Sequence, residues 1–387
     1  GGGEAGGGAG AGAAEEGILL VGGTDELPPE FLELAGRDPS RRGRRAAAGG
    51  VGNYFASAGA DGAEALNMLR CEHFLTGEPG SGLPGTQPFS VRVDPRVLAV
   101  MDFHAHLLSC EIIGFLGGRW DGEARMLHLC EAFPCRSLNA NTGAMHVELD
   151  PLAEVQVRQA IEDKQMRVVG WYHSHPIFAP QPSLRDVQNQ TNYQYLFHDP
   201  LLNMMPFIGV IISPYDSRTS SASSAITMFY VENTSGAAGR PMRCSYSTVL
   251  RPAPPAAPVE GAAAPLARMH AARPPPPAGE RELEHELTAT CRILCALVHY
   301  YKRNRSRTSM QAAWRARQKG HGASSSGGAG GGSGSAAGGA PTISVPSSKL
   351  DKLRRSVRGR LVQSFSHEVI DAAIDGVCRV VEAHWGK

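Results

Sequence analysis

Two histidines, a serine and an aspartate stand at spacings that suit a metal site. His173 and His175 are two residues apart, and Ser183 and Asp186 follow them after Pro176. The apolar residues before His173 predict a strand, so both imidazoles would face one side where that strand ends. Two imidazole nitrogens and one carboxylate oxygen give zinc three protein ligands and leave a position for water, which is typical of catalytic sites. The sequence therefore predicts one catalytic Zn²⁺ per chain, held by His173, His175 and Asp186.

Each part of this pattern also has a simpler interpretation. A His-x-His pair can be two hydrogen-bonded histidines near the end of a strand. Ser183 and Asp186 also fit the start of a helix, with Ser183 as the N-cap and a carboxylate in the first turn. The two interpretations of Asp186 are compatible, because a first-turn carboxylate can point back at a metal held by the strand.

The spacing resembles the JAMM motif of the MPN-domain zinc metalloproteases. That motif includes an upstream glutamate, which Glu111 matches in this sequence. The resemblance spans about residues 88–231 and is carried by Met101–His106, Gly117–Trp120, Phe133–Ser137, Gly170–Pro176, Pro182–Asp186 and Ile212–Tyr215. Within the family, these segments are similar to those of histone deubiquitinases with Myb-like and SWIRM domains and of MPN domain-containing proteins.

The resemblance implies a hydrolytic reaction with named roles. Zinc in such a site lowers the pKa of water to about 7 and polarises the scissile carbonyl. Glu111 would accept the proton of that water and return it to the leaving amine. Ser183 would donate a hydrogen bond to the tetrahedral oxyanion, as the family resemblance implies. The predicted activity is a deubiquitinating isopeptidase, whose partners are ubiquitin and a ubiquitylated protein, with histones and nucleosomes as candidates.

Two other functions are compatible with the sequence. One is a non-catalytic MPN scaffold inside a larger complex, although scaffold members typically have a degraded motif and all five positions are present in this chain. The other is a chromatin-binding or nucleic-acid-binding module with an inert MPN fold. Its support comes from basic runs at 37–45, 302–319 and 349–360. Such runs are more often solvated tails than nucleic-acid contacts.

The order of elements predicts an α/β fold, a single MPN domain with a curved mixed sheet flanked by helices. We expect strands at 89–93, 111–118, 126–131, 167–173, 207–213 and 225–231, and helices at 95–108, 151–163 and 183–197. The expected organisation is a low-complexity, largely disordered region at 1–85, a catalytic core at 86–232, a Pro/Ala-rich linker at 233–279, a helix at 280–306, a Gly/Ser-rich disordered linker at 307–346, and C-terminal helices at 347–385. We expect these last helices to pack on the core, with the binding of protein partners as the alternative.

A second His-x-His pair, His104 and His106, has a different context. Apolar residues around it recur at helical spacing, and residues i and i+2 of a helix face different directions. The sequence therefore favours a packing role for this pair over metal ligation.

Polar residues also lie in two loops that resemble insertions of the family. His146, Glu148 and Asp150 belong to the loop 138–150, and we expect them at the surface or in contact with substrate rather than at the metal. Both this loop and the loop 196–206 are short, which by analogy fits an enzyme of the histone type better than a specialist for one ubiquitin linkage.

Composition limits the compartment and the partners. The formal net charge is +1, so no global field favours nucleic acid. The eight cysteines include no Cys-x-x-Cys pair, and no apolar run reaches the length of a membrane-spanning helix. Together with the absence of a secretory signal, this predicts a reducing compartment, the nucleus and/or the cytoplasm, and no membrane partner.

Overall fold

The computed structural model describes residues 68–137, 149–216, 218–232, 239–250, 278–314 and 348–385. Its strands form one nine-stranded mixed sheet in the order β1-β8-β7-β6-β5-β3-β4-β2-β9. The strands are β1 (Glu72–His73), β2 (Ser90–Val93), β3 (Ile113–Asp121), β4 (Met126–Cys135), β5 (Arg167–Ser174), β6 (Ile208–Ser213), β7 (Ala225–Glu232), β8 (Arg240–Arg243) and β9 (Ser247–Thr248). The helices are α2 (Pro95–Leu107), α3 (Pro151–Asp163), α4 (Leu184–Leu196), α5 (Ala278–Tyr301), α6 (Lys349–Leu361) and α7 (His367–Trp385).

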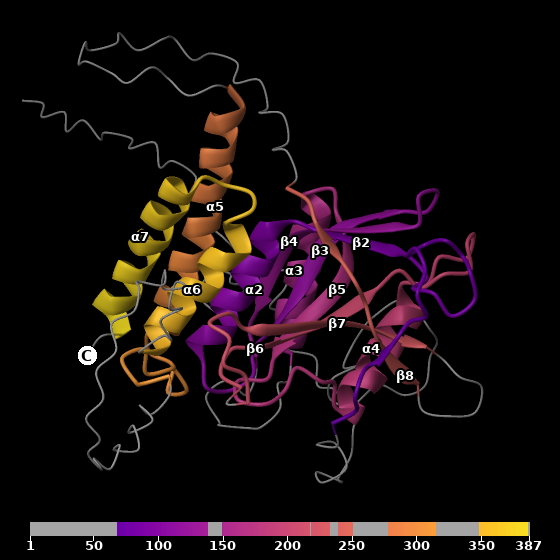
Figure 1. Cartoon of the computed structure of the whole chain (residues 1–387), viewed down its shortest axis with the longest axis horizontal. Helices are drawn as coiled ribbons and strands as arrows, with labels where there is room; N and C mark the ends of the chain where they lie inside the picture. The colour runs from indigo at the N-terminus through magenta and orange to yellow at the C-terminus, as the bar shows by residue number, and fades with distance from the viewer. Residues whose placement is uncertain are drawn as a thin grey trace, which may run out of the picture.

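Helices cover both faces of the sheet, which makes three layers. One hydrophobic cluster joins the sheet to α2, α5, α6 and α7, and a second joins it to α3 and α4. Figure 1 shows α5, α6 and α7 grouped beside α2 at one side of the molecule. The expected α/β class is confirmed, because strands with apolar residues on both faces need helices on both sides.

The central strand β5 is held closely by its neighbours. It pairs parallel with β6 and antiparallel with β3, so that His173 lies opposite Ile113 and Ile211. A Cβ atom added at Gly170 would lie 2.6 Å from the carbonyl oxygen of Ile208. Glycine at this position therefore permits the close approach of β6 to the strand that carries the histidines.

The C-terminal helices are tied to α2 by a buried polar network. Asp102 on α2 is fully buried and accepts hydrogen bonds from Arg360 Nε at 2.9 Å and from Ser356 Oγ at 2.6 Å. Ser224, in the loop between β6 and β7, also donates to Asp102. Arg360 and Ser356 belong to α6, so one carboxylate links α2, α6 and the β6–β7 loop.

The expected boundaries differ from the structure at the sheet edges. β1 precedes residue 85 and pairs with β8, and both β8 and β9 lie in the segment expected to be a linker at 233–279. These strands have two to four residues, which is too short for an alternating pattern to show in the sequence. The expectations for 1–67, 251–277 and 315–347 lie outside the described residues.

No helix within the described ranges is long and apolar enough to cross a membrane. The basic run at 349–360 forms helix α6, which lies within the C-terminal helices expected at 347–385. Lys352 of this helix is fully buried, so the run is not a solvated tail.

Candidate metal centre

The two histidines of the motif lie where β5 ends. His173 is the penultimate residue of the strand, and His175 follows directly after it. The backbone N–H of His175 donates to the carbonyl of Ile212 at 2.9 Å, so β6 fixes the position of the residue beyond the strand. Both side chains are buried.

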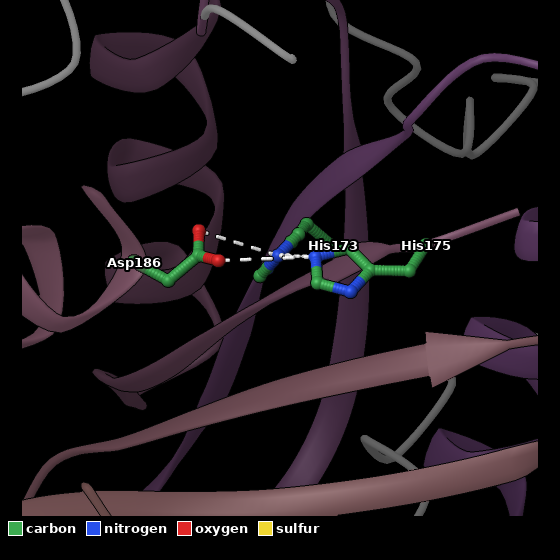
Figure 2. A group of neighbouring side chains, drawn as sticks. All are labelled: His173, His175 and Asp186. Carbon is green, nitrogen blue, oxygen red and sulfur yellow. Dashed lines mark hydrogen bonds and ion pairs between the residues drawn. The ribbon is translucent and has the colours of Figure 1, made fainter. Parts of the chain in front are cut away.

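Asp186 reaches the same point from the first turn of α4. Figure 2 shows its carboxylate pointing toward the two imidazole rings. His173 Nε2 lies 3.0 Å from His175 Nε2 and 3.3 Å from Asp186 Oδ1, and His175 Nε2 lies 3.8 Å from Asp186 Oδ2. One potential ligand atom from each residue lies within 4.8 Å of the others. The three residues that the sequence predicted as ligands therefore converge.

The donor chemistry of this group fits a zinc ion. His175 Nδ1 lies 3.0 Å from the carbonyl oxygen of Ala179, and a proton on Nδ1 leaves the lone pair of Nε2 directed at the centre. Two nitrogens bound to zinc at tetrahedral angles would lie about 3.3 Å apart, close to the observed separation of the His173 and His175 nitrogens. The carboxylate of Asp186 supplies the negative charge that a divalent ion needs.

Burial and mutual charge set the protonation of the three groups. Burial lowers the pKa of His173. Burial opposes protonation of His175 as well, but the hydrogen bond and charge of Asp186 and the charge of Glu111 raise the pKa of His175. Burial raises and the two histidines lower the pKa of Asp186, with a net shift well below its usual range. Asp186 is therefore ionised at neutral pH, which is the form that ligates metals.

Ser183 and Asp186 form a capping box at the start of α4. Ser183 Oγ donates to Asp186 Oδ2 at 2.7 Å, and the backbone N–H of Asp186 donates to Ser183 Oγ at 3.2 Å. The pair thus caps the helix, as the simpler interpretation predicted, while Asp186 also points at the two histidines. The hydroxyl of Ser183 is turned toward the carboxylate of Asp186, and its role at an oxyanion stays a prediction.

Glu111 lies beside the centre but farther out than the three predicted ligands. Its Oε1 atom is 3.8 Å from His175 Nε2, and its side chain is 14% exposed. The prediction that Glu111 begins a strand is wrong by two residues, because β3 starts at Ile113. Its position lets it contact both the metal site and a molecule entering from solvent.

Residues that the spacing did not single out support the turn after His175. Tyr215 N–H donates to the carbonyl of Pro176 at 3.0 Å, and Ser213 Oγ donates to the carbonyl of Phe178. The ring of Tyr215 packs against Trp314. Lys349 Nζ of α6 lies 4.5 Å from the centroid of the Tyr215 ring. The signal in the sequence was the resemblance of Ile212–Tyr215 to the family, which gave no role to these residues.

The second histidine pair is not part of the centre. His104 Nδ1 lies 2.9 Å from Tyr172 Oη, and His104 Nε2 lies 3.0 Å from Tyr301 Oη. His106 Nδ1 lies 2.8 Å from the carbonyl oxygen of Asp102. Both histidines are fully buried in α2, as the helical spacing indicated.

The loop residues have mixed outcomes. Asp150, expected at the surface or in contact with substrate, is 5% exposed. It caps α3 by accepting a hydrogen bond from Leu152 N–H, and it pairs with Arg136. The expectation for Asp150 is therefore wrong, because a carboxylate directly before Pro151 serves as an N-cap. His146 and Glu148 lie outside the described residues.

The loop 196–206 lies away from the centre. Trp120 Nε1 donates to Asp199 Oδ2 in this loop at 2.8 Å. Trp120 is near the end of β3, whereas Ile113 at its start is paired with His173. Trp120 is seven residues from Ile113 along β3, which corresponds to about 23 Å of extended strand. The inference drawn from the shortness of this loop is not tested by its position and stays a prediction.

The fold and the centre define a class of protein. Residues 86–198 match the family model described as JAB1/Mov34/MPN/PAD-1 ubiquitin protease, and this part of the chain is an MPN domain. The histone deubiquitinase MYSM1 of Branchiostoma floridae is 38% identical over 168 residues, which are 43% of this chain and 19% of that protein. The deubiquitinase MYSM1 of Homo sapiens is 40% identical over 145 residues, which are 38% of this chain and 17% of that protein.

A further relative and one solved structure are also similar to this chain. An MPN domain-containing protein of Danio rerio is 39% identical over 145 residues, which are 38% of this chain and 31% of that protein. The chain thus spans less than a third of the length of these relatives. A solved structure of a protein from Salinibacter ruber has 19% identity and a TM-score of 0.28, covering 41% of this chain and 91% of that one, and this likeness is too weak to inform the fold.

Proposed function

We propose that the chain is a zinc-dependent isopeptidase that removes ubiquitin from a lysine of a protein substrate. The observation that carries the proposal is the convergence of His173, His175 and Asp186, with Glu111 at 3.8 Å from His175. The match to a family of ubiquitin proteases and the similarity to relatives named deubiquitinases support the same reaction.

His173, His175 and Asp186 would hold the zinc ion. When bound, zinc polarises a carbonyl oxygen and makes water acidic enough to attack at neutral pH. Glu111 would accept the proton of the attacking water and deliver it to the lysine amine as that amine leaves. Ser183 keeps Asp186 oriented through the capping box, and rotation of its hydroxyl would present a hydrogen-bond donor to the oxyanion.

The substrate we favour is a ubiquitylated histone. The support is the name of the relative from Branchiostoma floridae, a histone deubiquitinase. The corresponding location is the nucleus and/or the cytoplasm, and the partners are ubiquitin and the ubiquitylated protein.

A non-catalytic MPN scaffold and a chromatin-binding module are the alternatives. Both predict a stable MPN fold without turnover. The site argues against them because it keeps two imidazoles, one ionised carboxylate and a second carboxylate nearby in one place, which a scaffold does not need.

The test uses the full chain on a panel of di-ubiquitins and on nucleosomes carrying ubiquitylated histones. We expect cleavage that a zinc chelator abolishes and added Zn²⁺ restores. Cleavage that is unaffected by the chelator would exclude the zinc mechanism. A zinc-loaded protein that cleaves none of these substrates would favour the scaffold.

A further inference from the structure

Part of the basic run at 302–319 forms a defined loop beside the candidate centre. We call residues 302–307 the basic loop. Lys302, Arg303, Arg305 and Arg307 are all exposed, and within the described ranges no ion pair includes any of them. Four cations in six residues therefore meet solvent without a neutralising carboxylate, in a chain whose formal net charge is only +1.

Hydrogen bonds attach the basic loop to the segment that carries Glu111. Ser109 N–H donates to the carbonyl of Ser306 at 2.7 Å, and Thr308 N–H donates to the carbonyl of Leu107 at 2.8 Å. Ser109 is two residues before Glu111, so their Cα atoms lie within about 7 Å. Figure 1 shows the loop in orange at the end of α5 that adjoins α2.

The basic loop is also held in one shape by its own contacts. Ser306 N–H donates to Asn304 Oδ1 at 2.8 Å, and Arg307 Nη1 donates to the carbonyl of Lys302 at 2.9 Å. The cations are therefore presented on a fixed turn, which lowers the entropy lost when they bind a partner.

We propose that the basic loop binds the phosphate backbone of duplex nucleic acid next to the catalytic centre. Exposed Arg and Lys side chains are the groups that contact phosphates, and such contacts need charge and hydrogen-bond donors but no apolar anchor. The substrate class follows, and this step rests on the proposed function: a ubiquitylated protein that is bound to nucleic acid, with the phosphates placing its ubiquitylated lysine near Glu111.

The composition of the basic loop favours a phosphate backbone over an acidic protein. Stable protein interfaces depend on buried aromatic or aliphatic anchors. The sequence Lys-Arg-Asn-Arg-Ser-Arg at 302–307 contains none. A contact made by charge alone is the sequence-independent kind that proteins make with nucleic acid.

The binding test compares two variants of the full chain that lose the same charge. The first is Lys302→Gln/Arg303→Gln/Arg305→Gln, which leaves the structural bond of Arg307 in place. The control is Arg92→Gln/Arg119→Gln/Arg167→Gln, whose exposed side chains lie on strands at the end of the sheet away from His173.

Binding of a short fluorescent DNA duplex is measured by anisotropy over a range of salt concentrations. The slope of log K against log salt is negative, and its magnitude should decrease by about 0.9 for each lost phosphate contact. The magnitude should therefore decrease by about 2–3 in the loop variant and stay near the parent value in the control. Equal slopes for the two variants would overturn the proposal. So would a loop-dependent affinity for polyglutamate that exceeds the affinity for the duplex.

Cleavage then separates this inference from the proposed function. The loop variant should raise KM for ubiquitylated nucleosomes and leave cleavage of di-ubiquitin at the parent rate. A loop variant with parent KM on nucleosomes would refute the substrate class. If the parent cleaves nothing, the proposed function fails, while the duplex-binding slopes still decide whether the basic loop binds phosphate.

Discussion

The buried carboxylate of Asp102 should make a large contribution to stability. It is fully buried, and it accepts hydrogen bonds from Arg360 and Ser356 of α6 and from Ser224 of the β6–β7 loop. Asp102→Asn keeps the shape but leaves the guanidinium of Arg360, whose side chain is 16% exposed, without its counterion. Breaking a buried pair in this way costs about 3–5 kcal/mol, and we expect a value near 3 because the amide oxygen still accepts one hydrogen bond.

A matched control is another ion pair made by an arginine of α6. Asp371 pairs with Arg358 across α6 and α7, with side chains that are 50% and 33% exposed. Asp371→Asn should change the free energy of unfolding little, because an exposed ion pair is screened by solvent. The assay is urea unfolding followed by tryptophan fluorescence, with midpoints compared at an unchanged m value.

The pH dependence gives a second check on Asp102. Burial raises the pKa of Asp102, but the charge of Arg360 and the hydrogen bond from His106 lower it further than burial raises it. Because the pKa of Asp102 is lowered in the folded state, its ionised carboxylate stabilises the fold at neutral pH. This stabilisation is lost as pH falls below about 4. The difference in the free energy of unfolding between the parent and Asp102→Asn should therefore be constant from pH 6 to 8. If the free energies of unfolding of Asp102→Asn and Asp371→Asn differ by less than about 1 kcal/mol, the buried ion pair does not stabilise the fold as proposed.

Three further predictions concern the centre and α2. One zinc per chain should be found by elemental analysis, and a His173→Ala/His175→Ala protein that retains zinc would reject the ligand set. Ser183→Ala should cost about 1 kcal/mol through loss of the cap and lower kcat by about 10²–10³-fold while zinc stays bound at one per chain, and a parent kcat would contradict a role at the oxyanion. Burial lowers the pKa of His104 to about 3. Its neutral form therefore stabilises the fold above about pH 6.5, so the parent should lose up to about 1.4 kcal/mol per pH unit relative to His104→Asn on acidification below that pH. A parent and variant with parallel pH curves would contradict this.

The sequence predicts the core elements of the centre because their signals are local. His173, His175 and Asp186 fall within one strand, one turn and one helix start, so spacing alone brings them together. Glu111 is different, since its place depends on the pairing of Ile113 with His173, about 60 residues away along the chain. Only the family resemblance pointed to it.

The burial of Lys352 in α6 was not visible in the sequence for a physical reason. A run with six Lys and Arg residues is usually solvated, and the sequence gives no sign of the partners that allow burial. In the structure, Lys352 Nζ donates to the carbonyl of Ser221 at 3.1 Å and lies 3.6 Å from the ring centroid of Trp314. These partners come from distant segments, and a charge becomes buried only where tertiary packing supplies them.

The zinc content and cleavage rate of one variant, Glu111→Gln, test the proposed zinc isopeptidase mechanism most directly. This change keeps the size of the side chain and its hydrogen bonding but removes the proton acceptor. We expect zinc to stay bound at one per chain, ubiquitin affinity to be almost unchanged, and cleavage of a ubiquitin conjugate to fall by about 10²–10⁴-fold. A zinc-loaded Glu111→Gln protein that cleaves at the parent rate would contradict the mechanism.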